Sequence, residues 1–315
     1  MSLIPPSSPR VQRGRTLLEL LIAIAIGLVI LLALGTVYLA TTSTNRQSTS
    51  VSRMSEDAAV AFNLMGSGLR MAGYSAPRAL VLPGGAMFGG VKVVAPDRNF
   101  VGAAVRGCDN GFVDGTVAFE SLACGTDTAL PAAVAIRFEG DAFNTVPITV
   151  SGTVHPSDCL NNAVTDALAT ASAIDPARKY RLIDSRFTAQ VSNTSGTPEL
   201  FCGGNGGGFT PQPLMQFIDS VQLRYGVAAD GTSRDVTHYA TAAEVDALPG
   251  STDDRWARVV NIKLCMVMRS QARDQAGAGN YIDCDGTSTA SADGFARRAF
   301  TSFYALRNRS GFLTP

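Results

Sequence analysis

The chain offers few side chains that could act as nucleophiles, general bases or phosphate ligands. Its only histidines, His155 and His238, fall in stretches that read as loops, where a lone histidine is usually exposed or hydrogen-bonded. A G-x-S-x-G elbow is not found, because Gly286–Ala290 departs from that pattern at its last residue. The glycine-rich run Gly203–Gly208 lacks the lysine and hydroxyl residue that follow a phosphate-binding loop, so we expect a flexible loop there. The sequence therefore predicts a protein that is not an enzyme.

Three aspartates near the C-terminus, Asp283, Asp285 and Asp293, could in principle hold calcium. Their spacing does not match an EF-hand loop, which needs acids at alternate positions and a final glutamate, so we expect a solvated turn. Zinc is not expected either, because the chain has only two histidines and no C-x-x-C pair. We therefore predict no metal and no cofactor.

A cluster of basic residues lies close to the C-terminus, at Arg297, Arg298, Arg307 and Arg309. Lysine plus arginine and aspartate plus glutamate each number 26, so the formal net charge is zero. Because nucleic-acid binding depends on excess positive charge, we expect a strand edge with solvated charges and no nucleic-acid partner.

The six cysteines all lie in the part of the chain from residue 108 onwards. An even set confined to that part is typical of disulfides formed in an oxidising compartment. Six cysteines allow 15 pairings, among which sequence alone does not choose. Short loops close at lower entropic cost, so proximity favours three pairs: Cys108–Cys124, Cys159–Cys202 and Cys265–Cys284.

One acid, Glu19, stands at the start of the uncharged, mostly apolar run Leu20–Ala40. As a helix this run spans roughly 31 Å, which matches the hydrocarbon core of a bilayer. Arginines precede the run at positions 10, 13 and 15, so the positive-inside rule places the N-terminus in the cytoplasm and the rest outside. The alternatives are a cleaved secretory signal, whose apolar region is usually shorter, and a plain signal anchor.

Glu19 has two interpretations. A carboxylate at the bilayer centre costs roughly 2.5–3.5 kcal/mol, and near the edge it can snorkel to water at lower cost. Alternatively, it awaits a positive partner inside the membrane or inside an assembly of packed helices.

The stretch Gly14–Leu20, which reads GRTLLEL, resembles the type IV prepilin signal. The resemblance implies that a prepilin peptidase cuts between Gly14 and Arg15 and that the apolar run is retained. It also implies N-methylation of the new N-terminus and a role for Glu19 as the acid that faces the N-terminal amine of a neighbouring subunit. Pilins usually begin with phenylalanine or another apolar residue, and here that position is Arg15.

Helical and strand patterns follow the apolar run. Apolar residues recur at spacings of three and four from Val51 to Leu69, and Gly73 is a credible stop, so one helix is predicted over Thr16–Ala72. Alternation predicts half-buried strands over 134–138, 221–227 and 260–268, with a last strand over 300–307. Loops are expected over 82–90, 203–208 and 283–293. The fold class is α+β, with a long helix packed on an antiparallel sheet and disulfide-bonded loops.

The later part of the chain is similar to PilW-type minor pilins in several blocks: Leu69–Tyr74, Pro213–Met215, Val221–Val227, Trp256–Val260, Val267–Ser270, Arg298–Phe300 and Ala305–Arg309. The resemblance implies a pilin-like fold divided into a leader (1–14), an assembly helix (15–40), its amphipathic continuation (41–74) and a β-rich extracytoplasmic domain (75–315). It further implies a structural minor pilin that primes and assembles type IV pili, in a system used for cell adhesion and twitching motility.

The partners implied are the prepilin peptidase, other minor pilins, the major pilin and a tip adhesin. The protein would reside in the inner membrane with a cytoplasmic N-terminus and a periplasmic C-terminal domain, and then in the pilus. A type II secretion pseudopilin of the J family shares much of this pattern and stays open as an alternative. A membrane-tethered binding domain and a tethered hydrolase are alternatives of other classes.

Overall fold

A computed structural model of the chain describes residues 16–76, 99–100, 102–128, 130–165, 169–171, 179–273 and 279–308. Its internal contacts divide the chain into two units, Met1–Val51 and Ser52–Pro315. The helix residues beyond Val51 bury one face within the second unit, and the division predicted at 40 and 74 stays a prediction. The predicted loop over 82–90 lies outside the described residues.

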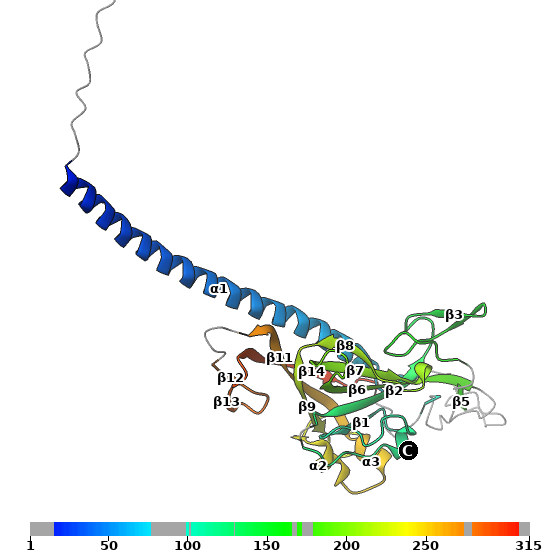
Figure 1. The fold of residues 1–315 in the computed structure, drawn as a ribbon. Helices are drawn as coiled ribbons and strands as arrows, with labels where there is room; N and C mark the ends of the chain where they lie inside the picture. Colours follow the sequence, from blue (N-terminus) through cyan, green and yellow to red (C-terminus); the bar gives the residue numbers. More distant parts are fainter. Residues whose placement is uncertain are drawn as a thin grey trace, which may run out of the picture. The chain divides into compact units, whose positions relative to one another are not determined.

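The first element is the long helix α1, Leu17–Met71, as the spacing of apolar residues predicts (Figure 1). Within the second unit its buried face consists of Met54, Ala58, Ala61, Met65, Gly66 and Leu69. Gly73 ends the helix with a φ of 74°, a conformation that glycine adopts without a steric penalty. Its backbone N–H donates to the carbonyl of Arg137 at 2.9 Å, so the turn that ends the helix is joined to a strand.

Two antiparallel sheets form the body of the second unit (Figure 1). The larger has the order β1-β2-β6-β7-β8, with β5 also paired to β6. Its strands are β1 Val105–Cys108, β2 Ala133–Gly140, β5 Ala169–Ala171, β6 Lys179–Val191, β7 Pro198–Gly204 and β8 Gln212–Gln216. The second sheet has the order β10-β9-β11-β14. Its strands are β9 Ile218–Val227, β10 His238–Ala240, β11 Val259–Arg273 and β14 Phe295–Ala305.

A single residue, Phe217, separates β8 from β9 and therefore joins the two sheets. Its φ of 65° is unusual for a bulky side chain and turns the chain from one sheet into the other. Its carbonyl accepts a hydrogen bond from the N–H of Arg269 at 3.0 Å, which fixes the junction against β11.

Smaller elements connect the strands. Two hairpins are formed by β3 Ile148–Val150 with β4 Thr153–His155, and by β12 Asn280–Ile282 with β13 Ser288–Ala290. Two short helices, α2 Ala242–Asp246 and α3 Thr252–Trp256, each begin with a capping box. The 3-10 turns η1 Phe119–Ser121 and η3 Asn205–Gly207 complete the set. The predicted α+β class, with a long helix, antiparallel sheets and disulfide-bonded loops, is confirmed.

The strands predicted over 134–138, 221–227 and 260–268 all lie within observed strands. β9 buries roughly alternate residues, but β2 is buried at almost every position. β2 is covered on two sides: Ile136 lies close to Gly68 of α1, and Arg137 lies over the ring of Phe119 in η1 at 4.5 Å. The alternation in the sequence of β2 therefore did not indicate a solvent-exposed face.

Several predicted loops and one strand end need correction. The run 203–208 is not a flexible loop, because Gly203 and Gly204 end β7 and η3 follows. A side chain at Gly204 would overlap the carboxylate of Asp158, so the close approach of two segments explains the glycine. The stretch 283–293 contains β13, and the last strand occupies Phe295–Ala305 rather than 300–307. Phe295 pairs with Arg273 beyond a register irregularity, a long-range contact that the local pattern did not reveal.

The histidine placements also differ from those predicted. His155 ends β4 and is buried, whereas His238 begins β10 and is exposed. The strands that contain them are three residues long, which is too short for an alternating pattern to be recognised.

All six cysteines are paired, as Cys108–Cys124, Cys159–Cys202 and Cys265–Cys284, with Cα–Cα distances of 5.1, 6.5 and 5.8 Å. These are the three pairs that proximity favours. The second disulfide joins the segment after β4 to β7, and the third joins β11 to the segment after β12. Each disulfide therefore attaches a connecting segment to a strand of one of the two sheets.

Candidate functional site

The first candidate site is the apolar surface of α1 in the first unit. Large apolar side chains from Leu17 to Leu39 are between 51% and 78% exposed. Within the described residues, α1 is the one helix long and apolar enough to cross a membrane, with a mean hydropathy of 3.0 over its most apolar window. A surface of this kind is stable only when lipid or other apolar helices cover it.

Glu19 lies in the first turn of α1, next to this apolar surface. Its backbone N–H donates to the hydroxyl of Thr16 at 3.3 Å, and the N–H of Leu20 donates to the carbonyl of Thr16 at 3.2 Å. Thr16 thus accepts hydrogen bonds from N–H groups that the start of a helix leaves without partners. A carboxylate in the first turn also interacts favourably with the helix dipole.

Thr16 is a positioning residue that the sequence reasoning missed. The signal was available, because a threonine three residues before a glutamate at the start of an apolar run is the pattern of a helix cap. The cap sets where the helix begins, and so it fixes the position of Glu19 along the helix axis.

Hydroxyl groups near the end of the apolar run are satisfied within the helix itself. Thr36, Thr41, Thr42 and Thr44 donate to the carbonyls of Ala33, Val37, Leu39 and Ala40 at 2.8 to 2.9 Å. A hydroxyl that is already hydrogen-bonded enters apolar surroundings at a lower cost. These threonines therefore add little polar cost at the end of the apolar run, and the predicted end of the membrane segment at Ala40 stays a prediction.

The second half of α1 is held by the end of the chain. The Tyr304 hydroxyl donates to the carbonyl of Phe62 at 2.8 Å, and the Asn308 amide donates to the carbonyl of Arg70 at 3.0 Å. At Gly66 a Cβ atom would lie 2.4 Å from a ring carbon of Tyr304, so only glycine permits this close approach. Close packing of β14 on α1 therefore accounts for the glycine at position 66.

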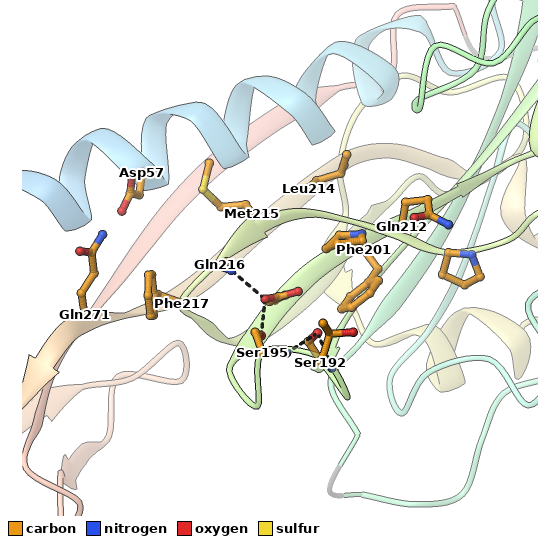
Figure 2. Close-up of a pocket in the computed structure, with 14 residues that line it drawn as sticks. Asp57, Ser192, Ser195, Phe201, Gln212, Leu214, Met215, Gln216, Phe217 and Gln271 are labelled. Atoms are coloured by element: carbon orange, nitrogen blue, oxygen red, sulfur yellow. Dashed lines mark hydrogen bonds between the residues drawn. The ribbon is translucent and has the colours of Figure 1, made fainter.

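A cleft of about 750 Å³ lies in the second unit beside β8 (Figure 2). Its lining comes from α1, the segment before β7, β7, β8 and the end of β11. Figure 2 shows Asp57 on the helix side and the Ser192–Ser195 segment on the opposite side, with Phe217 and Gln271 at one end.

Glu199 provides a buried carboxylate at this cleft and is only 1% exposed. Its Oε1 accepts hydrogen bonds from the Ser195 hydroxyl at 2.5 Å, the Gln216 amide at 3.1 Å and the Thr197 hydroxyl at 3.2 Å. The hydroxyl of Ser195 is the largest cause that lowers the pKa of Glu199, so this carboxyl is ionised at neutral pH.

The acids and arginines near the C-terminus form contacts with each other. Asp283 accepts hydrogen bonds from the backbone of its own turn, Asp285 bonds to Gln222 and Arg224, and Asp293 pairs with Arg297. The hydrogen bonds from Arg297 hold the pKa of Asp293 far below its usual range. Within the described residues, no group of three acids, histidines or cysteines is arranged to hold a metal.

Arg297 departs from the predicted solvated strand edge, whereas Arg309 of the same cluster lies outside the described residues. The guanidinium of Arg297 is mostly buried and pairs with Asp219 as well as Asp293. Asp219 lies in β9, so its ion pair with Arg297 joins two strands of the second sheet, and the pair with Asp293 attaches the turn before β14 to that strand. The sequence did not reveal this, because Asp219 is far from Arg297 along the chain.

The structure describes Glu19 but not Gly14 and Arg15, which lie outside the described residues. The predicted cleavage site therefore stays a prediction. The six predicted cysteines come together as three disulfides, which lie in the second unit, whereas Glu19 lies in the first.

Comparisons with known proteins identify two parts of the chain. The family model described as Type IV Pilus-assembly protein W matches residues 187–308, and that of the prokaryotic N-terminal methylation motif matches residues 9–35. No curated protein matches the chain. A solved structure of a type IV-like pilin, TTHA1219 from Thermus thermophilus, is similar at 11% identity and a TM-score of 0.39, covering 82% of this chain and 98% of that chain.

Proposed function

The chain is a type IV pilin-like protein of the PilW type, with an N-terminal methylation motif, and from this premise we propose that it is a minor pilin that helps to prime and assemble type IV pili. As a pilin it is a structural protein rather than an enzyme. The motif implies processing by a prepilin peptidase and association with other pilins.

The observation that carries the proposal is the exposed apolar surface of α1 with Glu19 in its first turn. Lipid covers such a surface while the subunit stays in the membrane. In a filament, the apolar helices of other subunits would replace the lipid, and a lone carboxylate among them would be costly. Pairing of Glu19 with the N-terminal amine of a neighbouring subunit offsets this cost and selects one axial register.

The finer steps follow from the same premise. The peptidase would cut between Gly14 and Arg15, and Arg15 would become the methylated N-terminal residue. The subunit would remain in the inner membrane, with its C-terminal domain in the periplasm, until it joins other minor pilins, the major pilin and a tip adhesin. The Arg15 guanidinium would add a second positive group near the acid of the adjacent subunit.

The test replaces Glu19 by alanine in cells that carry no other copy of the gene. We expect normal amounts of processed protein in the membrane and fewer pili on the cell surface, because the paired register is lost. Piliation is counted by electron microscopy, and processing is measured by the intact mass of the purified protein. Glu56→Ala, which removes an exposed acid from the outer half of the same helix, is the matched control and should leave piliation unchanged.

Wild-type piliation with Glu19→Ala would contradict the assembly role, since an acid that only snorkels at the membrane edge is dispensable for assembly. If cells with Glu19→Ala make normal pili but fail to secrete proteins through a type II secretion system encoded alongside this gene, the pseudopilin alternative would be favoured.

A further inference from the structure

The cleft beside β8 has an unusual balance of charge. Two carboxylates, Asp57 and Glu199, are among the residues that line it, and none of its lining residues is a lysine, arginine or histidine. Glu199 is held by neutral hydroxyl and amide donors, so its negative charge is retained rather than neutralised by a cation. Asp57 forms no ion pair in the described part of the chain and is partly exposed on the helix side of the cleft.

The two carboxylates act on the same cavity from different elements. Asp57 comes from α1 and Glu199 from β7, and both are among the residues that line the cleft; Figure 2 shows Asp57 on the helix side. Charges that line a partly enclosed cleft interact with an entering ion more strongly than charges in open water. The cleft is therefore electrostatically suited to a cation and unsuited to an anion.

The rest of the lining suits a cation that carries an aliphatic stem. Leu214 and Met215 of β8 line the cleft together with Phe201 of β7, and Phe217 adds a further apolar side chain at one end. Lysine and arginine side chains place their methylene groups on such apolar surface while the charged end reaches a carboxylate. Gln212, Gln216 and Gln271 add neutral hydrogen-bonding groups around the rim.

The position of β8 favours an extended chain as the source of that cation. β8 is the last strand in the order of the larger sheet, and no described strand pairs with its outer edge. Pro211 and Pro213 are exposed at this edge and lack N–H donors, which prevents continuous strand pairing. A segment bound here would therefore depend on its side chains more than on a backbone ladder.

We propose that this cleft binds an extended segment of another protein through one lysine or arginine side chain, which enters the cleft beside Asp57 and is attracted by the negative charges of Asp57 and Glu199. The proposal concerns the second unit and does not rest on the role in pilus assembly. It assigns the cleft a partner of defined chemistry, a cationic side chain on an otherwise uncharged, extended segment.

The test uses the full chain in detergent micelles and a fluorescent, end-capped peptide of alternating threonine and valine with one central arginine. The comparison peptide has citrulline, a neutral group of the same shape, in place of arginine. Fluorescence anisotropy should show that the arginine peptide binds about 3-fold to 10-fold more tightly, with a difference that shrinks as salt is raised.

Two variants locate the effect. Asp57→Asn should remove most of the preference for arginine over citrulline, and it changes a partly exposed residue on the helix surface, so the fold should be retained. Glu56→Gln, the same change of charge at the adjacent exposed acid outside the cleft, is the matched control and should leave the preference intact.

Three results would overturn the proposal. The first is equal affinity for the arginine and citrulline peptides, and the second is an equal loss of preference in Asp57→Asn and Glu56→Gln. The third concerns agmatine, which presents the same guanidinium on a free aliphatic amine. If agmatine alone binds as tightly as the arginine peptide, the cleft recognises a small cation and not an extended segment.

Discussion

The contact between Gly66 and Tyr304 decides whether replacing Gly66 by alanine raises or lowers the stability of the protein. Replacing a helical glycine by alanine stabilises an exposed helix by about 1 kcal/mol, because glycine loses more backbone entropy on folding. At Gly66 the new Cβ would lie 2.4 Å from one ring carbon of Tyr304 and 2.7 Å from its hydroxyl oxygen, so the ring must move.

Movement of the ring carries two costs. The hydrogen bond from the Tyr304 hydroxyl to the carbonyl of Phe62 contributes about 1 kcal/mol, and overpacking of a buried site costs about 1–3 kcal/mol. Subtracting the gain in helix propensity leaves Gly66→Ala destabilised by about 1–3 kcal/mol. For a domain of this size, that lowers the melting temperature by about 2–10 °C.

Gly68 provides the internal control, because it lies in the same helix only two residues away. A Cβ there meets Ile136 at 3.4 Å and Phe187 at 3.8 Å, which are ordinary contact distances. Gly68→Ala should therefore keep most of the helix gain and raise stability by up to about 1 kcal/mol. Thermal unfolding of the full chain in detergent, followed by circular dichroism, measures both variants. A Gly66→Ala protein at least as stable as the wild type would refute the packing argument.

Two further predictions concern the second unit. Replacing both Cys159 and Cys202 by serine should cost about 4 kcal/mol in urea unfolding, against about 3 kcal/mol for Cys108 and Cys124, because their sequence separations are 43 and 16 residues; the opposite order would contradict the loop-entropy argument. Arg297 lowers the pKa of Asp293 in the folded state, so this pair stabilises the fold above the unfolded pKa of about 4 and loses its effect as the pH falls towards the lower folded value. The difference in melting temperature between wild type and Asp293→Asn should thus be constant from pH 5 to 7 and shrink progressively as the pH falls below about 4, and a difference as large at pH 3 as at pH 6 would show that the ion pair is not its cause.

Periodic patterns predicted the long elements well. The spacing of Met54, Ala58, Ala61, Met65 and Leu69 defined the buried face of α1, since each turn of the helix returns a residue to the same side. The three alternating stretches each fell within a long strand for the same reason. Local periodicity is strong evidence when an element is long enough to repeat.

Local periodicity in the sequence does not predict contacts between segments that lie far apart along the chain. Arg297 read as a solvated charge because its partner Asp219 lies in β9, and the extension of β14 back to Phe295 depends on its pairing with Arg273. The cleft combines residues from α1, β7, β8 and β11, and its buried Glu199 carried no local signal. By contrast, the Thr16 cap was readable in the sequence and was overlooked.

The hydrogen bonds that join the end of the chain to α1 have a consequence for the order of folding. Tyr304 and Phe62 are separated by 242 positions, and Asn308 and Arg70 by 238, so these contacts have a very high contact order. While the chain is being synthesised, the helix is complete long before the strand that holds it exists. Folding of the second unit is therefore complete only after β14 has been synthesised and has packed against the helix. A chain that stops before Tyr304 leaves the side of the helix around Gly66 uncovered and prone to aggregation.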